Sequence, residues 1–340
     1  MNIVIMAGGK GTRFWPRSVD AKPKQFLSFH TERTLIQETL ARFRKLVDDS
    51  RLFIAVPKRY LPLVETQLPD LNPRQIIVEP EQKDTAACIA LAAFRFLQAG
   101  DDRPVVFAPS DQYVADEEPF LSAIRVAART AQIKDAIVTL GVQPSRPETG
   151  FGYLRTTASD EAQPSENILR VIRFLEKPDT RQAEQLIEEP DVFWNSGVFI
   201  CRPSTIQRAM ERFQPQLWNS LVQYPSDAAA AYARMPQLSI DYAVMEHIES
   251  LYCIPIHCGW DDIGSWAALR RHLPLDANDN LINGAATLVD ARGNTVYVGD
   301  QQALIIGVHD LIIVSTGTGL LVCPRSEEPR LKSWLNQTPG

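Results

Sequence analysis

Long hydrophobic runs are absent from this 340-residue sequence. A membrane-spanning helix needs roughly 18 or more consecutive apolar residues, and no segment approaches that length. The apolar run at the N-terminus is only a few residues long and ends in glycines, so we do not expect a signal peptide. These absences favour a cytoplasmic protein that does not span or enter a membrane.

Recognisable thiol and metal motifs are also absent. No C-x-x-C occurs, and the cysteines are odd in number, which argues against a zinc site or a disulfide framework and favours free thiols in a reducing cytoplasm. They are Cys88, Cys201, Cys253, Cys258 and Cys323. The five histidines form no ligand-spaced pair, and no Ser-His-Asp order supports acyl transfer.

An excess of positive charge is the third absence. Lys and Arg number 35 against 41 Asp and Glu, giving a net charge of −6. We therefore expect neither nucleic acid nor a membrane as a partner, and any affinity for phosphate must be local. The 45% of hydrophobic residues is enough for a sizeable core, and the length allows one large domain and one small one.

Against this background one stretch, residues 3–27, stands out. It opens with Ile3-Val4-Ile5-Met6, which predicts a buried strand, and small residues follow at once. Glycine permits turns that bring successive backbone N–H groups to one side, and such concave donor sets bind anions. Arg13, Lys22 and Lys24 follow the glycines. The stretch therefore predicts a polyphosphate site with backbone donors and fixed cations.

Two common phosphate motifs do not fit this stretch. A Walker A loop ends in Gly-Lys-Ser/Thr, which is absent here. In a dinucleotide fingerprint the third glycine lets a helix pack closely on a strand, and Phe14 occupies that position. An ordinary glycine-rich turn is the alternative, and the combination with Arg13, Pro16-Arg17 and Pro23-Lys24-Gln25-Phe26 weighs against it.

These residues carry a family resemblance. The run from Gly8 to Ser18, GGKGTRFWPRS, followed by Pro23-Lys24-Gln25-Phe26-Leu27, closely resembles the signature of bacterial mannose-1-phosphate guanylyltransferases, a branch of the sugar nucleotidyltransferases. The resemblance extends over nearly the whole chain, from Asn2 to about Trp334. It implies an enzyme that uses GTP, mannose 1-phosphate and Mg²⁺.

The pattern of elements predicts an α/β fold. Strands and helices alternate through the first 142 residues, which predicts a Rossmann-like, mostly parallel sheet with helices on both faces. We expect strands at 3–6, 52–56, 75–78, 104–108 and 136–142, and helices at 34–47, 85–99 with Asp84 as N-cap, and 117–133. The alternation then loosens, with strands at 151–155, 168–175, 197–201 and 251–257, and helices near 180–188, 203–213 and 240–250.

The pattern of predicted secondary structure changes near Asp276. Short β-rich runs at 295–298, 303–306, 311–314 and 320–322 are separated by Gly, Asp and Asn, which predicts a small all-β domain. We therefore expect a catalytic domain at 1–275 and an appendage at 276–340, for which the resemblance implies a left-handed β-helix. Some family members carry a further isomerase domain, and none is expected within these 340 residues.

Two acidic positions are candidates for a metal site. Asp111 follows a predicted buried strand, at the end of a sheet where ligands gather, and Mg²⁺ prefers one or two carboxylates with phosphate oxygens and water. Asp261 and Asp262 stand between two tryptophans, where burial of both charges is costly without a cation. A capping or surface-turn role is the alternative. The resemblance implies that Asp111 and Asp262 bind the metal and that Asp261 is secondary.

The remaining site assignments come from the resemblance. It implies a sugar site at Gly150, Glu176, Lys177, Asn195 and Gly197. It implies nucleotide contacts at Ala7, Gly8, Gly9, Gly11, Thr12, Arg13, Lys24, Glu79, Thr85, Ser110 and Asp111. Glu79 and Glu81 both offer acceptors for the guanine N–H groups. Lys83, Asp84 and Ala87 depart from the family pattern, so the choice of base is open.

The expected reaction is transfer of GMP from GTP to mannose 1-phosphate, giving GDP-mannose and pyrophosphate. Positioning and charge neutralisation do most of the work in such transfers. The expected catalytic residues are Arg13, Lys24, Asp111, Lys177 and Asp262. Two alternatives remain: a sibling nucleotidyltransferase for another base or sugar, and a non-catalytic regulatory protein that binds a nucleotide sugar. Whether the protein forms a homodimer is left open.

Overall fold

The computed structural model describes residues 1–9, 11–29, 31–158 and 167–337, without the side chains of Thr12, Asp300 and Asn336. The chain forms two compact units. The first, here called the sheet unit, comprises Met1–Gly8, Thr39–Ser110 and Val114–Trp260. The second, called the coil unit, comprises Gly9–Glu38, Asp111–Tyr113 and the chain from Asp261 onward. The expected boundary at 275/276 stays a prediction.

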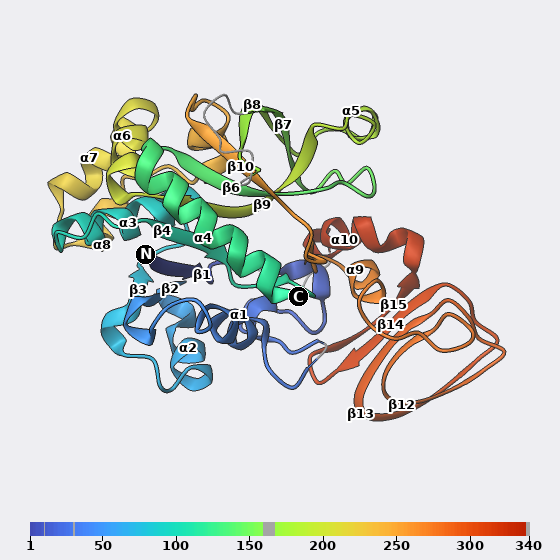
Figure 1. Cartoon of the computed structure of the whole chain (residues 1–340). Helices are drawn as coiled ribbons and strands as arrows, with labels where there is room; N and C mark the ends of the chain where they lie inside the picture. Colours follow the sequence, from blue (N-terminus) through green and yellow to red (C-terminus); the bar gives the residue numbers. More distant parts are fainter. Residues whose placement is uncertain (10, 30, 159–166, 338–340) are drawn as a thin grey trace. The chain divides into compact units, whose positions relative to one another are not determined.

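The sheet unit is built on a nine-stranded sheet with the order β3-β2-β1-β4-β9-β6-β10-β8-β7 among the described residues (Figure 1). Its strands are β1 (Asn2–Met6), β2 (Leu52–Pro57), β3 (Ile76–Glu79), β4 (Val105–Pro109), β6 (Ile137–Val142), β7 (Gly152–Ala158), β8 (Leu169–Glu176), β9 (Val192–Cys201) and β10 (Leu251–Ile256). Every strand expected before residue 260 is present, with ends displaced by a few residues and β9 starting five residues earlier than predicted.

The sheet is parallel only in part. β3, β2, β1 and β4 run parallel, as do β6 and β10. β9 lies antiparallel to β4, β6 and β7, and β8 is antiparallel to β7 and β10. The expectation of a mostly parallel sheet therefore holds for the N-terminal strands and is wrong for the later ones, because direct β7–β8 pairing replaces helical crossovers there.

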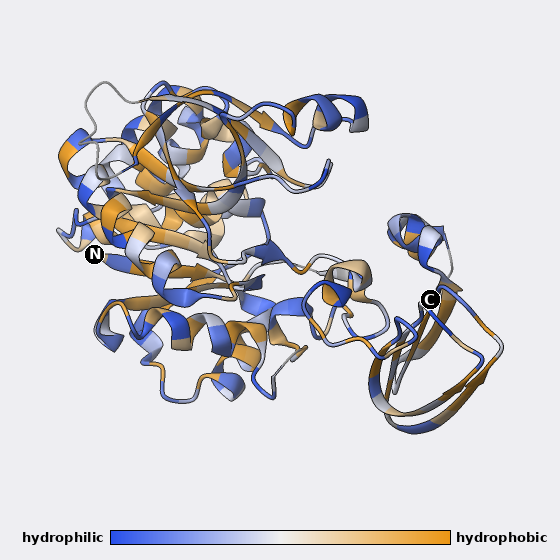
Figure 2. Ribbon diagram, turned by 45° about the vertical axis from the view of Figure 1, so that its right-hand side comes forward, coloured by the Kyte–Doolittle hydropathy of each residue, from blue (hydrophilic) through white to orange (hydrophobic). Residues whose placement is uncertain are grey.

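Helices cover the sheet. α4 (Glu117–Lys134), the long green helix in Figure 1, lies against β4, β6, β9 and β10, while α3 (Asp84–Gln98) packs with α6 (Pro203–Phe213) and α7 (Pro215–Gln223). The shorter helices are α1 (Leu35–Phe43), α2 (Leu61–Gln67), α5 (Thr180–Leu186) and α8 (Ala228–Tyr232). Figure 2 shows hydrophobic residues concentrated on the strands between these helices. α2, α7 and α8 were not predicted.

Three helix predictions need correction. α1 ends at Phe43 rather than at 47, because the amides of Lys45 and Leu46 bond to carbonyls three residues back and tighten the last turn. Asp84 is the first residue of α3 and not its N-cap; it has φ of 66° and accepts the Thr85 amide at 2.8 Å. The helix expected at 240–250 is a π-helical turn, Asp241–Met245.

The coil unit is all-β in its C-terminal part. β12 (Leu281–Val289), β13 (Thr295–Ile306) and β14 (Leu311–Thr316) pair in parallel, and β15 (Gly319–Pro324) closes the sheet antiparallel to β14. Two short runs expected at 295–298 and 303–306 form the single strand β13, and β12 was not predicted. α9 (Trp266–Arg270) precedes the coil and α10 (Leu331–Gln337) follows it.

The segment after the glycines is anchored in this unit. Phe14 is fully buried, with its ring 4.8 Å from Phe29 and 5.1 Å from Trp266. The same hydrophobic cluster includes Ile312 and Val314 of β14. Phe14, which excluded a dinucleotide fingerprint, thus fixes the loop to the C-terminal strands.

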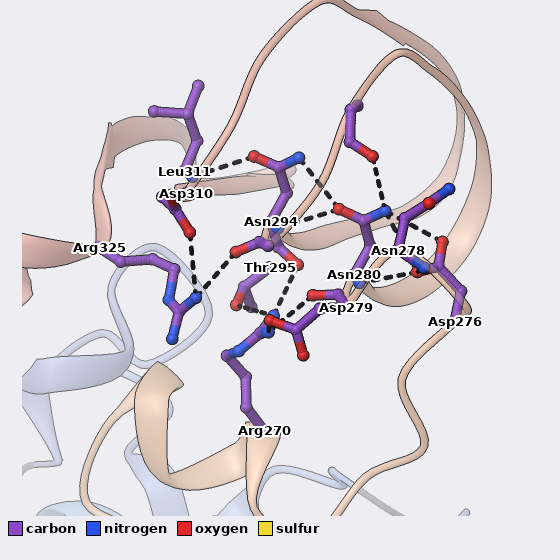
Figure 3. A network of polar contacts seen from close by, with 12 residues as sticks. Arg270, Asp276, Asn278, Asp279, Asn280, Asn294, Thr295, Asp310, Leu311 and Arg325 are labelled. Carbon is purple, nitrogen blue, oxygen red and sulfur yellow. Dashed lines mark hydrogen bonds and ion pairs between the residues drawn. The ribbon is translucent and has the colours of Figure 1, made fainter.

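Asparagine side chains form hydrogen bonds between the turns that connect the C-terminal strands (Figure 3). The Asn294 amide donates to the Asn280 side chain and to the Val308 carbonyl, both at 3.0 Å, and its oxygen accepts the Leu311 amide at 3.0 Å. Arg270 of α9 donates to the Asn294 carbonyl at 2.8 Å. One buried side chain therefore joins three consecutive turns.

Replacing Asn294 by alanine is expected to destabilise the protein by about 3 kcal/mol, because it leaves several buried polar groups without partners. Chemical unfolding of the full chain measures this loss. Asn283→Ala, which removes an exposed asparagine from β12, is the matched control and should change stability by less than about 0.5 kcal/mol. Equal stability of the two variants would contradict the structural role of Asn294.

Candidate active site

The glycine loop brings its backbone close to Lys24. Gly11 has φ of +58°, and a Cβ there would lie 2.9 Å from the Lys24 backbone nitrogen, so both the conformation and the space require glycine. Gln25 donates to the Gly9 carbonyl at 3.0 Å and holds the two ends of the loop together. Lys10 and the side chain of Thr12 lie outside the described residues.

Lys24 bridges the two predicted metal ligands. Its Nζ lies 3.0 Å from Asp111 Oδ2 and 3.1 Å from Asp262 Oδ1. The lysine side chain is only 4% exposed, whereas the carboxylates are 28% and 31% exposed. Burial alone would lower the pKa of Lys24, but the two carboxylates outweigh it and raise this pKa above its ordinary value. The ammonium is therefore firmly charged.

A short strand pair brings the two aspartates together. β5 (Gln112–Tyr113) pairs antiparallel with β11 (Asp261–Asp262), so that Asp262 faces Gln112, the neighbour of Asp111. Arg13 joins them from the glycine loop: a Cβ on Gly264 would lie 3.2 Å from an Arg13 guanidinium nitrogen and 3.1 Å from Asp262 Oδ2. Arg13, Lys24, Asp111 and Asp262, which were predicted from separate motifs, thus lie close together in the coil unit.

The aspartate pair has the donor chemistry of a partial magnesium site. Within the described residues no three His, Cys, Asp or Glu side chains gather in a way that could hold a metal ion. Mg²⁺, however, keeps waters and is commonly held by one or two carboxylates together with substrate phosphates. Two partly exposed carboxylates that share one cation fit that requirement, with phosphate oxygens completing the set.

Asp261 and Glu328 form hydrogen bonds with residues that follow Asp262 in the sequence. Asp261 Oδ2 accepts from Arg271 at 2.8 Å and lies 2.8 Å from His272 Nε2. Glu328 accepts the amides of Trp266 and Ala267 at the start of α9. Sequence reasoning missed Glu328, since nothing local connects it with a helix more than sixty residues earlier.

The sheet unit contributes the other nucleotide candidates. Ala7 and Ser110 are held by backbone bonds to Ala55 and Met6 at the ends of their strands. Gly8 lies beside Glu79, since a Cβ there would be 3.6 Å from Glu79 Oε2. Gln82, which was not predicted, donates to the Gly8 carbonyl. The Thr85 hydroxyl accepts a hydrogen bond from the Ile240 amide at 2.8 Å, which is a structural contact in addition to the expected contact with the nucleotide.

Glu79, the candidate contact for the guanine base, is buried. It is 3% exposed, and the Tyr232 hydroxyl donates to its Oε1 at 3.2 Å. Burial raises the pKa of Glu79 to about 7, against the opposing hydrogen bonds from Tyr232 and Cys88. Near neutral pH this carboxyl is therefore partly protonated and can donate as well as accept.

This raised pKa predicts pH-dependent stability. The folded state favours the neutral acid, so the stabilisation by Glu79 is complete below pH 4.5 and is lost as the pH rises through about 7. Relative to Glu79→Gln, the wild type should lose on the order of 3 kcal/mol between pH 4.5 and 8. Chemical unfolding at both pH values measures it. Glu81→Gln, at an exposed carboxyl, should show no such change, and parallel behaviour of wild type and Glu79→Gln would refute the assignment.

The predicted sugar residues lie in the sheet unit. Glu176, at the end of β8, pairs with Lys177, whose pKa is raised because Glu176 and Asp241 outweigh its burial. A Cβ on Gly152 would lie 2.6 Å from Glu176 Oε2, so that glycine makes room for the carboxylate. The Glu176 amide donates to Glu246 at 3.3 Å. The ion pair of Glu176 and Lys177 thus lies at the end of β8.

Asn195 is linked to Asp241. Its Nδ2 donates to Asp241 Oδ1 at 3.2 Å, while its oxygen accepts from Thr139 at 2.9 Å and from the Gly197 amide at 3.1 Å. Burial, then the charge of Glu176, raise the pKa of Asp241 to about 7. Gly197 has φ of +71°. These bonds fix the orientation of the Asn195 amide.

Gly150 is bonded within its own turn. Its amide donates to Glu148 Oε1 at 3.2 Å. The other Glu148 oxygen pairs with Arg146 at 3.3 Å, and the Arg146 guanidinium lies 4.9 Å from the ring of Trp194. Neither Arg146 nor the carboxylate of Glu148 was singled out from the sequence.

Comparison with known proteins shows the family to which the chain belongs. Residues 2–278 match the family described as Nucleotidyl transferase. The chain is 34% identical to a mannose-1-phosphate guanylyltransferase of Salmonella muenchen, over 97% of this chain and 71% of that protein. It is 31% identical to the alginate biosynthesis protein AlgA of Pseudomonas aeruginosa, over 97% of this chain and 70% of that protein.

A solved structure from Thermus thermophilus, titled mannose-1-phosphate geranyltransferase, superposes with a TM-score of 0.88 at 29% identity. The alignment covers 99% of this chain and 98% of that one, so both units have counterparts. Among the described residues, no helix combines the length and the apolar character needed to cross a membrane.

Proposed function

The chain belongs to the nucleotidyl transferase family, and from that premise we propose that it transfers GMP from GTP to mannose 1-phosphate, giving GDP-mannose and pyrophosphate. The observation that supports this most is the convergence of Asp111 and Asp262 on Lys24, with Arg13 beside Gly264 and Asp262. Relatives named mannose-1-phosphate guanylyltransferase, at 33% and 34% identity, support the sugar and the base.

The coil-unit cluster suits attack on an α-phosphorus. The sugar phosphate oxygen attacks in line, the bond from the α-phosphorus to the bridging oxygen breaks, and pyrophosphate leaves. Lys24 neutralises charge at the α-phosphate, and Arg13 stabilises the charge that develops on the leaving pyrophosphate. The backbone amides of Gly8, Gly9 and Gly11 supply further donors to the phosphates.

Asp111 and Asp262 are the residues that would hold Mg²⁺. A bound Mg²⁺ neutralises phosphate charge and lowers the mutual repulsion of the two substrates. Because Lys24 already lies between these carboxylates, it screens their repulsion and keeps both of them near the reacting phosphates.

The sheet-unit residues suit a hexose phosphate. Lys177 pairs with the sugar's phosphate, Glu176 accepts hydrogen bonds from vicinal hydroxyls, and Asn195 donates to a hydroxyl. Gly197 permits close approach, and Gly150 contributes once its amide is released from Glu148. Ala7, Thr12, Thr85 and Ser110 belong to the nucleotide contacts, and Glu79 is the proposed acceptor for guanine.

Pyrophosphate release tests the proposal. Purified protein is supplied with mannose 1-phosphate, Mg²⁺ and one of GTP, ATP, UTP or dTTP, and then with GTP and a panel of hexose 1-phosphates. Turnover only with GTP and mannose 1-phosphate supports the assignment. Preference for another pair would make the chain a sibling enzyme, and binding of GDP-mannose without turnover would make it a regulatory protein.

Two finer assignments are also proposals. We infer a reducing, cytoplasmic location, supported by the five cysteines, all of which are free thiols. We also infer that the parallel C-terminal coil is a left-handed β-helix, supported by the stacking of β12, β13 and β14 and by the asparagines in its turns.

A further inference from the structure

A cavity with several polar lining residues lies wholly within the coil unit, apart from the Lys24 cluster. It has a volume of about 460 Å³ and is lined by the segment that follows Arg13, by strands β13 and β14, and by the turn after β14. Its cationic lining residues are Arg17 and Lys22, and its hydrogen-bonding ones include Gln301, Ser315 and Thr318. Nothing in the proposed reaction uses these side chains.

Arg17 is a half-buried cation held by a backbone carbonyl and two aromatic rings. Its guanidinium donates to the Ser28 carbonyl at 2.6 Å and stacks on Tyr297 at 4.0 Å and on Phe29 at 4.8 Å. Among the residues that the structure describes, it forms no ion pair with an acidic side chain, in contrast to Lys24. A charge partly withdrawn from water is costly unless it is paired, so an anion placed beside Arg17 would be stabilised.

The rest of the lining is suited to an anion with hydroxyl groups. Lys22, an exposed lysine, adds a second positive charge, and the described lining residues include no Asp or Glu. Ser315 and Gln301 are joined at 2.7 Å and present further polar atoms. An Arg–Lys pair with hydroxyl and amide neighbours favours a phosphate over a single carboxylate, since phosphate offers three oxygens and more charge.

We propose that this cavity binds a phosphomonoester of a small hydroxylated metabolite, such as a sugar phosphate, at a site separate from the catalytic one. The volume lies within the range of small-molecule pockets. Arg17 and Lys22 hold the phosphate, and the polar lining residues of β13, β14 and the turn after β14 contact the hydroxylated body.

The position of the cavity connects its occupant to the catalytic segment. The Pro16 carbonyl accepts from the Thr318 hydroxyl at 2.6 Å and from Thr316 at 3.4 Å, which ties the cavity wall to the β14–β15 turn. Pro16, Arg17 and Lys22 all lie between Arg13 and Lys24 in the sequence. A bound phosphomonoester therefore restrains the stretch of chain that carries both catalytic cations.

The test measures binding of glucose 6-phosphate to the full-length protein by calorimetry, with GDP-mannose and Mg²⁺ saturating the catalytic site. We expect saturable binding that is tighter than that of inorganic phosphate, and none for glucose. Hydrogen–deuterium exchange should show protection within residues 295–320, which are distant in sequence from every proposed catalytic residue. Arg17→Gln should weaken binding about tenfold or more, and Lys22→Gln about threefold.

Arg33→Gln is the matched control, since it removes an exposed arginine of the same unit that does not line the cavity. Its affinity should stay within about twofold of wild type. If Arg17→Gln does not fold, the affinity of Lys22→Gln for glucose 6-phosphate decides the test, because an exposed lysine can be changed without loss of packing. No saturable binding, equal binding by Lys22→Gln and wild type, protection elsewhere, or inorganic phosphate binding as tightly as glucose 6-phosphate would each overturn the proposal.

Discussion

Replacing Arg13 by alanine is expected to lower kcat by about 10²- to 10³-fold while leaving the fold intact, as removal of one preorganised charge stabiliser does elsewhere. The guanidinium lies beside Gly264 and Asp262, where the negative charge of a leaving pyrophosphate would need compensation. Arg13 is exposed, so its side chain contributes little to stability and the loss should fall on turnover.

Steady-state kinetics and thermal unfolding together check this prediction. Arg33→Ala removes an exposed arginine from the same unit and should retain normal turnover. Arg13→Lys should recover only part of the rate, because an ammonium cannot reproduce the planar fork that a guanidinium offers to phosphate. Turnover near normal in Arg13→Ala would remove Arg13 from the reaction and with it the proposed role of the glycine loop.

The sequence was a reliable guide where a signal is local. Ile3–Met6 followed by glycines predicted a strand and a loop, and β1 and the positive φ of Gly11 agree with it. Asp111 and Asp262 were each predicted from a few neighbouring residues. That they meet at Lys24 depends on the pairing of β5 with β11, two strands of two residues each, which no hydrophobic period can reveal.

Contacts over long sequence distances were not predictable. Glu79 was expected at the base because of its place in a motif, but it is a buried acid whose pKa is raised by burial, and it accepts from Tyr232, more than 150 residues away. Glu328 supports α9 in the same long-range manner. Antiparallel insertion of β9 between β4 and β6 was missed for a related reason: an apolar strand shows no preference for direction.

Replacing Lys24 by methionine should have the second large effect, with losses in both activity and stability. The substitution keeps a long apolar stem but leaves Asp111 and Asp262 facing each other without a cation. We expect kcat to fall about 10³-fold, at the upper end of the effect of removing one preorganised donor. Breaking a fully buried pair costs about 3–5 kcal/mol, and the partial exposure of both carboxylates reduces this to on the order of 2 kcal/mol. Lys332→Met, at an exposed lysine, should be neutral in both measurements.

The stability loss and the metal proposal can be separated with this variant. If repulsion between the carboxylates causes the loss, Lys24→Met/Asp262→Asn should regain much of the stability without regaining activity. If the same carboxylates bind Mg²⁺, the ion should raise the unfolding temperature of Lys24→Met by several degrees more than that of wild type, since Lys24 no longer competes for them. A Lys24→Met protein that Mg²⁺ stabilises no more than wild type would show that the aspartates serve only as partners of the lysine, and the divalent ion would have to be assigned to other residues.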